Sequence, residues 1–305
     1  MYKQTNILLE SGTNEFELVE FLIEGKDKVH NFGINVAKVR EIIRTPKITE
    51  VPKAHPCIEG ITDLRGKIIP MINLPKWLEI ETEKPLSKAI ITEFNEAING
   101  FLVNNVTRIY RINWKDLMQP DELNYEDKKN CVTSIAKIDD KMILILDFEK
   151  IVGDIFPELY FTPEKTQLKK VDRKIKTLIA EDSSVIRKLV NKALEDAGYI
   201  VSVANNGEEA FHQLLQILDK AKRENKSVKE YIDVLITDLE MPKMDGAHLI
   251  KKIREIPEFD DLPIIVFSSM CSEENRRKLL SLGANDFISK PEVKILQEAI
   301  FRNLK

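Results

Sequence analysis

The chain has 305 residues, of which 43% are hydrophobic and 31% are charged, and its formal net charge is −4 at pH 7. This length favours two domains, and the composition is typical of a soluble globular protein. From Asp172 onward there are 22 basic and 23 acidic residues. The part of the chain before Asp172 contains the other 24 basic and 27 acidic residues. Neither half has the basic excess of a nucleic-acid-binding domain, so nucleic acid is excluded as the expected partner.

The cysteines and the N-terminus indicate the cellular compartment. Cys57, Cys131 and Cys271 are scattered and form no CxxC pair. This spacing argues against a disulfide framework or a zinc site and favours a reducing environment. The N-terminus has acidic residues where a secretory signal needs a basic start, and apolar runs such as Met142–Leu146 are too short to span a bilayer. We expect a cytoplasmic protein without direct membrane insertion.

Residues 1–160 contain short apolar stretches that alternate with turn signals. The stretches read FELVEFLI, KIIPMI, KAIITEF, GFLV and MILILDF, and EGKD, RGK and NNV lie between them. Only Asn35–Ile43 (NVAKVREII) has helical spacing of its apolar residues. The pattern predicts an all-β barrel or sandwich that carries one short helix. His30 and His55 have no metal-ligand spacing, so no enzyme site is expected in this half.

Residues 161–173 (FTPEKTQLKKVDR) are polar, charged and interrupted by a proline, and they predict a linker. From residue 174 to residue 305, apolar strands alternate with amphipathic helices. This alternation predicts a doubly wound (βα)5 domain with a parallel sheet covered on both faces. The expected strands lie in IKTLIAED, YIVSVAN, YIDVLITD, LPIIVFSS and NDFISK, and the expected helices are 184–197, one that starts near 207, 246–256, 273–282 and 293–304.

Polar side chains follow four of the five predicted parallel strands. Glu181 and Asp182 follow the first, Asp238 the third, Ser268 ends the fourth and Lys290 follows the fifth. Because the carboxyl ends of parallel strands meet at one edge, these side chains should lie together. Clustered carboxylates suit Mg²⁺, and an ammonium with a hydroxyl suits a phosphoryl group. A single acidic residue at the end of one strand would be an ordinary turn residue. Carboxylate, hydroxyl and ammonium groups at the ends of four strands instead predict a site where a carboxylate is phosphorylated.

Residues 174–305 resemble a response-regulator receiver domain in the segments LIAEDSS, LITDLEMPKMDG, PIIVFSS and GANDFISKP. The resemblance implies that Asp238 is the phosphoacceptor. It also implies a Mg²⁺ site made by Asp182, Asp238 and the backbone carbonyl of Glu240, with Glu181 acting through water. By the same resemblance, Ser268 and Lys290 bind the phosphoryl oxygens. Phe287 occupies the aromatic switch position, although an ordinary core role is the alternative.

Two residues in the receiver-like segment depart from the commonest family pattern. The first acidic pair is Glu181-Asp182 where Asp-Asp is more usual, and an acid, Glu240, stands two positions after the acceptor. We expect Glu240 to repel a phosphodonor and to alter the lifetime of the acyl phosphate. The charged stretch Leu218–Tyr231 lengthens the second crossover and is expected to form a solvated helix end or loop.

Residues 14–152 resemble CheW-type coupling domains, most clearly in the stretch from Asn31 to Leu74. The family fold is two five-stranded β-barrels joined by a hydrophobic core, and the family links chemoreceptor cytoplasmic tips to the histidine kinase CheA. Asn73 stands where many members have aspartate. Candidate partner-binding residues are Arg65, at a predicted hairpin turn, and an aliphatic set for which a core role is the alternative, namely Val36, Val39, Ile42 and Ile43.

A CheW-like domain, a charged linker and a C-terminal receiver together resemble the CheV family of chemotaxis proteins. The resemblance implies a non-enzymatic cytoplasmic adaptor that is recruited to receptor arrays and modulated by phosphorylation, either for adaptation or as a phosphate sink. A phosphoaspartyl phosphatase is an alternative, but it would carry its nucleophile after the first strand. A response regulator with another output, such as transcription, is a third interpretation, disfavoured by the charge balance.

Overall fold

The computed structural model describes residues 15–94, 97–118, 120, 131–157, 167–269 and 273–304. The chain divides into two compact units. One unit contains Phe16–Ile112 and Asp116–Ile155, and the other contains Asn113–Lys115 and Phe156–Lys305. We call them the N-terminal unit and the receiver unit. Residues 161–166 of the expected linker, and Cys271, lie outside the described residues.

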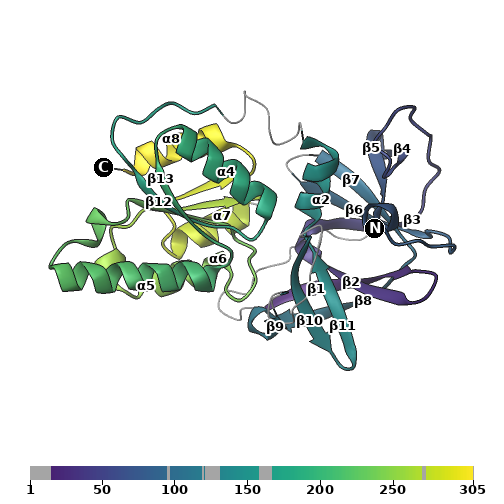
Figure 1. The fold of residues 1–305 in the computed structure, drawn as a ribbon, viewed down its shortest axis with the longest axis horizontal. Coiled ribbons are helices and arrows are strands. Elements are labelled where there is room, and N and C mark those ends of the chain that lie inside the picture. The colour runs from purple at the N-terminus through teal and green to yellow at the C-terminus, as the bar shows by residue number, and fades with distance from the viewer. Residues whose placement is uncertain are drawn as a thin grey trace. The chain divides into compact units, whose positions relative to one another are not determined.

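The N-terminal unit consists of two β-sheets, and both are drawn in Figure 1. Six strands form the first sheet, in the spatial order β8 (Asn105–Asn113), β1 (Glu15–Glu24), β2 (Val29–Asn35), β11 (Lys141–Leu146), β10 (Val132–Ile138) and β9 (Leu117–Met118). Five strands form the second sheet, in the order β3 (Val39–Arg44), β6 (Lys88–Phe94), β7 (Ala97–Val103), β5 (Lys67–Asn73) and β4 (Ile58–Leu64). The β-rich fold is therefore confirmed.

The first sheet differs from the expected five strands because the two-residue strand β9 pairs with β10. Strands β1 and β2 form an antiparallel hairpin. Strand β2 then pairs in parallel with β11, so that Phe32 lies opposite Leu144, a residue 112 positions later in the chain. The last strands of this unit thereby complete a sheet that the first strands begin.

An aromatic cluster connects the two sheets in the core of the N-terminal unit. The ring of Phe148, in helix α2 (Phe148–Ile155), lies 4.6 Å from that of Phe101 in β7 and 6.0 Å from that of Phe21 in β1. All three side chains have no exposed surface. Edge-to-face aromatic contacts of this kind add specific geometry to the burial of large apolar surfaces. One short helix thus packs against a strand of each sheet.

The helix predicted over Asn35–Ile43 is wrong. Only Val36–Lys38 forms a single 3₁₀ turn (η1), in which the Asn35 side chain accepts a hydrogen bond from the Ala37 N–H at 3.0 Å. Residues Val39–Arg44 form strand β3, which pairs with β6. The apolar spacing fits either structure, and the β-branched residues together with a pairing partner favour the strand. Consequently Ile42 is 38% exposed, whereas Ile43 packs against a core cluster.

The receiver unit is the predicted doubly wound α/β domain. Its strands are all parallel and lie in the order β13 (Ile200–Ala204), β12 (Lys176–Ala180), β14 (Val234–Thr237), β15 (Ile264–Ser268) and β16 (Asp286–Ser289). Helices α4 (Ser184–Asp196) and α8 (Val293–Asn303) cover one face, and α5 (Gly207–Glu224), α6 (Gly246–Arg254) and α7 (Glu273–Ser281) cover the other (Figure 1).

The lengthened second crossover has the expected character. Helix α5 continues to Glu224 and ends at Asn225, which adopts the left-handed conformation at the C-cap. A short 3₁₀ turn, Val228–Glu230 (η5), then leads to β14. Most residues from Lys222 to Glu230 are exposed, with Val228 buried as an anchor. The end of α5 and the turn that follows it are therefore solvated, and Val228 fixes this turn to the core.

Candidate functional site

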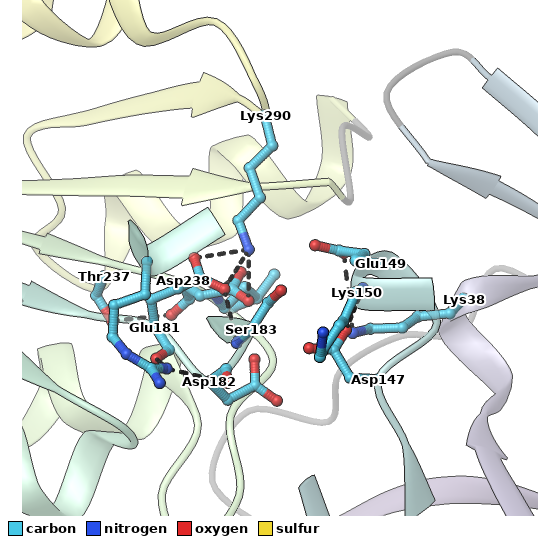
Figure 2. A network of polar contacts seen from close by, with 12 residues as sticks. Lys38, Asp147, Glu149, Lys150, Glu181, Asp182, Ser183, Thr237, Asp238 and Lys290 are labelled. Carbon is cyan, nitrogen blue, oxygen red and sulfur yellow. Dashed lines mark hydrogen bonds and ion pairs between the residues drawn. The ribbon is translucent and has the colours of Figure 1, made fainter. Parts of the chain in front are cut away.

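The polar residues predicted at the strand ends meet at one edge of the receiver sheet. Lys290, which follows β16, extends its ammonium group between two carboxylates (Figure 2). Its Nζ lies 2.8 Å from Oε2 of Glu181 and 2.9 Å from Oδ2 of Asp238. Glu181 follows β12 and Asp238 follows β14, so three strands contribute to one contact. The parallel topology brings these side chains together because the strands all end at this edge.

These three charged groups are almost fully removed from solvent. Lys290 and Glu181 are each 2% exposed and Asp238 is 4% exposed. Attraction between opposite charges is much stronger in such surroundings than in water, and removal of one partner leaves a buried charge without compensation. The ammonium group therefore offsets the repulsion that the two acids would otherwise exert on each other.

Asp182 joins Glu181 and Asp238 in an acidic cluster. One carboxylate oxygen from each residue lies within 4.8 Å of the other two. Three hard oxygen donors at this separation match the ligand preference of Mg²⁺, which usually retains several waters and binds one or two protein carboxylates. The donor set present in the protein therefore fits the metal that the sequence predicts.

The turn after β14 fixes the position of Asp238. Its main-chain N–H donates to the Ala180 carbonyl at 2.8 Å, and its Oδ1 accepts from the Leu239 N–H at 2.6 Å. Gly246, at the start of α6, approaches this turn so closely that an added Cβ would overlap the Asp238 carbonyl oxygen and lie 3.0 Å from Leu239 Cα. Gly246 of the sequence motif is thus required by backbone packing behind the site.

Arg187 is a contributor that the sequence analysis did not identify. This residue of α4 donates from Nη1 to the Glu181 carbonyl at 2.7 Å and to the Asp182 carbonyl at 3.1 Å. It holds the backbone of the acidic pair from outside the cluster. The only sequence signal for Arg187 is its position five residues after Asp182, in the following helix. This signal is weak because basic residues are common on exposed helix faces.

The remaining predicted receiver residues are buried close to these strand ends. Ser268 ends β15, is 1% exposed, and its carbonyl accepts from the Lys290 N–H at 3.1 Å. Glu240 is 6% exposed and lies on the turn after Asp238. Phe287 is 9% exposed and belongs to the core cluster on the α5–α7 face. Their roles toward a phosphoryl group stay predictions.

Arg65 and β3 come together in the N-terminal unit. Arg65 occupies the β4–β5 turn with φ of 54°, and its side chain is 77% exposed. Its Nη2 lies 2.8 Å from Oε2 of Glu41 in β3. Val36 and Val39 are half-buried, and Val39 begins the same strand. The partner-binding candidates therefore lie on η1, on β3 and in the β4–β5 turn, which contacts β3 through Arg65 and Glu41, rather than on a helix face.

Asn73 has a structural role that explains its identity. Its Oδ1 accepts from the Lys76 N–H at 2.8 Å, which caps helix α1 (Leu74–Trp77), and its Nδ2 donates to Glu59 at 2.7 Å. The Lys76 ammonium also contacts Glu59 at 2.8 Å. Hydrogen bonds from Lys76 and, less strongly, Asn73 lower the pKa of Glu59. An aspartate at position 73 would place a second negative charge against Glu59.

A second polar cluster connects η1 with α2 in the N-terminal unit, and Figure 2 draws it as well. Lys38 Nζ lies 3.9 Å from Oε1 of Glu149. Asp147 caps α2 by accepting from the Lys150 N–H at 2.9 Å, and Lys150 pairs with Asp154 at 2.8 Å. These contacts fix the short helix whose Phe148 ring lies between the two sheets.

Two family models match the chain. The CheW-like domain matches residues 17–156, and the response regulator receiver domain matches residues 177–301. The protein is therefore of the class in which a CheW-like domain is joined to a receiver domain. No helix in the described part of the chain is both long and apolar enough to cross a membrane.

Curated relatives extend this match to nearly the whole chain. Chemotaxis protein CheV3 of Helicobacter pylori is 34% identical over 302 residues, which cover 95% of this chain and 95% of the relative. Chemotaxis protein CheV2 of the same organism is 26% identical with the same coverage. Chemotaxis protein CheW of Thermotoga maritima is 33% identical over 48% of this chain and 94% of its own length. This chain belongs to the CheV family and is a chemotaxis coupling protein with a receiver domain.

Proposed function

We propose that Asp238 accepts a phosphoryl group and that this modification adjusts how the N-terminal unit couples chemoreceptors to the histidine kinase CheA. The observation that carries the proposal is the contact of one buried ammonium, that of Lys290, with Glu181 and Asp238. A carboxylate oxygen of Asp238 would attack the phosphorus of the donor. The new O–P bond forms as the bond to the leaving group breaks, which leaves an acyl phosphate on Asp238.

The side chains around Asp238 support this chemistry. Lys290 would neutralise charge on the transferred phosphoryl group, and the Ser268 hydroxyl would donate a hydrogen bond to it. Asp182, Asp238 and the Glu240 carbonyl would hold Mg²⁺, with Glu181 acting through water. When bound, Mg²⁺ supplies positive charge for the phosphoryl oxygens. Protein residues then mainly position the groups, since phosphoryl transfer needs little else from the protein.

Phosphorylation would also change which groups compete for Lys290 and Ser268. In the unmodified protein, the ammonium lies between Glu181 and Asp238. An acyl phosphate carries more negative charge and more acceptor oxygens than a carboxylate, so it would draw both groups toward itself. Movement of Ser268 would open space for Phe287 to pack inward, and this rearrangement would alter the surface formed by β15 and β16.

The proposed partners of the N-terminal unit are the cytoplasmic tips of chemoreceptors and CheA. The support is its CheW-like sequence, its two-sheet fold and the exposed Arg65 beside β3. Binding to receptor tips would bring the protein to receptor arrays. Its role there would be that of a scaffold, with phosphorylation serving adaptation or removal of phosphoryl groups from CheA.

One experiment tests the phosphoacceptor. The full chain is incubated with a small acyl-phosphate donor and Mg²⁺, and intact-mass spectrometry follows the uptake of one phosphoryl group. Wild type should be labelled and Asp238→Ala should not, while Asp219→Asn, which removes an exposed acid of α5, should behave as wild type. Labelling that persists in Asp238→Ala would refute the assignment. Turnover of a phosphomonoester would instead support the phosphatase alternative.

A second experiment tests the coupling role. The full chain and its Arg65→Ala variant are mixed with receptor tips and with CheA, and binding is measured for each pair. We expect the wild-type chain to bind both partners and Arg65→Ala to weaken binding to one of them by several-fold, about 1 kcal/mol for an exposed charged contact. A wild-type chain that binds neither partner would remove the adaptor proposal.

A further inference from the structure

Residues 167–173, the described part of the predicted linker, have no helix or strand of their own, yet specific contacts hold them to the receiver unit. The Val171 N–H donates to the Ala197 carbonyl, at the end of α4, at 2.9 Å. Arg173 lies 3.6 Å from the Asp233 carboxylate. A segment that lacks internal hydrogen bonds needs such partners to adopt one conformation, because ordering its backbone costs conformational entropy.

The strongest contact comes from Gln297 of α8. Its Oε1 accepts from the Lys169 N–H at 2.9 Å, and its Nε2 donates to the Lys169 carbonyl at 2.7 Å. The same Nε2 lies 3.4 Å from the Tyr199 hydroxyl. Gln297 is 4% exposed and Tyr199 is 5% exposed, so this polar side chain is buried where it meets the linker. The two atoms of one carboxamide thus satisfy both main-chain groups of a single linker residue.

Only a carboxamide can make this pair of contacts without a charge. Glutamine offers an acceptor and a donor side by side, whereas glutamate would direct a negative oxygen at the Lys169 carbonyl and methionine would offer neither bond. The Lys169 side chain takes no part in these two hydrogen bonds, because both involve its main chain. The interaction therefore depends on residue 297 and on the backbone of residue 169.

Helix α8 connects this contact to the phosphorylation site by a short path. Lys290, whose ammonium contacts Asp238, precedes the first residue of α8 by three positions. Gln297 lies four residues after Val293, the first residue of α8, which is about 6 Å along the helix axis. Helix α8 also packs against β15 and β16, which carry Ser268 and Phe287. A displacement of Lys290 or of these strands would therefore reach Gln297 through one rigid element.

We infer that Gln297 anchors the linker at Lys169 to α8, and that this anchor passes the state of the Asp238 site to the segment that leads to the N-terminal unit. Gln297 can anchor Lys169 whether or not Asp238 is a phosphoacceptor, whereas the transmission step rests on the proposed function. The contact is built from a residue that lies outside the phosphoacceptor site. Gln297 therefore acts as a positioning residue for the linker.

Hydrogen exchange at the Lys169 amide, measured on the full chain by mass spectrometry with single-residue fragmentation, tests the anchor. The wild type should protect this amide, and Gln297→Met should lower the protection about tenfold, the effect of losing a net hydrogen-bond contribution. Gln297→Glu keeps the acceptor and should still weaken protection through repulsion at the carbonyl. Lys169→Ala, the matched control, should keep wild-type protection. Equal protection in wild type and both Gln297 variants would overturn the anchor.

The transmission step is tested with the acyl-phosphate donor and Mg²⁺. In phosphorylated wild type, the exchange rate at Lys169 should change several-fold, and Asp238→Ala should show no change. Intact mass reports phosphoryl uptake in the same samples. Full uptake with an unchanged Lys169 rate would overturn the transmission step while leaving the phosphoacceptor proposal intact. Absence of uptake would overturn the proposed function and the transmission step with it, and the anchor would still be decided by the Gln297 variants.

Discussion

In the receiver unit, all five strands run in the same direction, so their carboxyl ends and the polar residues that follow them meet at one edge. In the N-terminal unit, most neighbouring strands are antiparallel, and polar side chains are distributed over two sheets. A site can therefore be located in the receiver from strand assignments alone. In the N-terminal unit, the same reasoning gives a fold but no site, because the polar side chains do not converge at one end of its strands.

The energetic comparison follows the same division. The receiver site holds a buried ammonium between buried carboxylates, whereas in the Arg65–Glu41 pair of the N-terminal unit the Arg65 side chain is 77% exposed. Removal of one partner from a buried ion pair strongly lowers the stability of the fold, whereas an exposed ion pair contributes little to it. Substitutions at the receiver site should therefore have large effects that depend on metal, and substitutions at the N-terminal surface should have small ones.

The largest effect is expected for Lys290→Met. It removes the cation between Glu181 and Asp238 and should lower the free energy of unfolding of the receiver unit by about 3–5 kcal/mol. Added Mg²⁺ should restore part of this loss, since a divalent cation neutralises the same carboxylates. Hydrogen exchange on receiver peptides, with and without Mg²⁺, measures both effects. Lys229→Met, which breaks the exposed 2.9 Å pair with Asp261, is the control and should change stability by less than about 1 kcal/mol.

A pair of glycine substitutions compares the two units directly. Gly246→Ala forces a methyl group against the backbone of the Asp238 turn and should cost about 2–3 kcal/mol and reduce phosphoryl uptake. Gly66→Ala, in the β4–β5 turn, meets no atom within 4 Å, so only its φ of +83° opposes alanine, at a cost of about 1 kcal/mol. Denaturation of the full chain, followed separately through peptides that come from each unit, measures both stability costs. Equal costs would contradict the packing argument for Gly246.

Glu240→Asn sharpens the description of the phosphorylation site. Removal of this negative charge should speed phosphorylation by an anionic acyl-phosphate donor by about fivefold, which corresponds to about 1 kcal/mol of repulsion. Time courses of phosphoryl uptake and loss measure this change. Glu195→Gln, an exposed position at the other end of α4, should leave both rates as in wild type. Unchanged uptake and loss in Glu240→Asn would show that the extra acid does not act on the donor.

The smallest effect is expected at Glu59 in the N-terminal unit. The pKa of Glu59 is lower in the folded state than its unfolded value near 4.5, so ionised Glu59 stabilises the fold at pH values above 4.5. This contribution disappears as the pH falls through the folded pKa. Lys76→Met removes the main cause of the shift and should cost less than about 1 kcal/mol at neutral pH, because both side chains of the pair are partly exposed to solvent. The difference from wild type should shrink in acid. A difference that is the same at both pH values would assign the effect to packing.

Much of the receiver could be predicted because strand and helix periods are clear in its sequence. Helix α8, expected over 293–304, spans Val293–Asn303, and Lys290 contacts Asp238 as the strand-end argument required. Arg187 and Gln297 could not be predicted, because long side chains that bind distant backbone groups leave no periodic signal. In the N-terminal unit, the apolar spacing predicts a helix over Asn35–Ile43, and the spacing alone does not distinguish a helix from a strand with a pairing partner, such as β3.

The parallel pairing of β2 with β11 has a consequence for synthesis of the protein. Phe32 can pair only after the ribosome has added Leu144, 112 residues later. In the receiver, Lys176 can pair with Ile200 after only 24 residues. Until β11 emerges, β2 presents an open strand edge to other nascent chains. Chains truncated before β11 should therefore aggregate, whereas in the receiver even the widest strand pairing, that of Thr177 with Val234, needs only 57 further residues of synthesis.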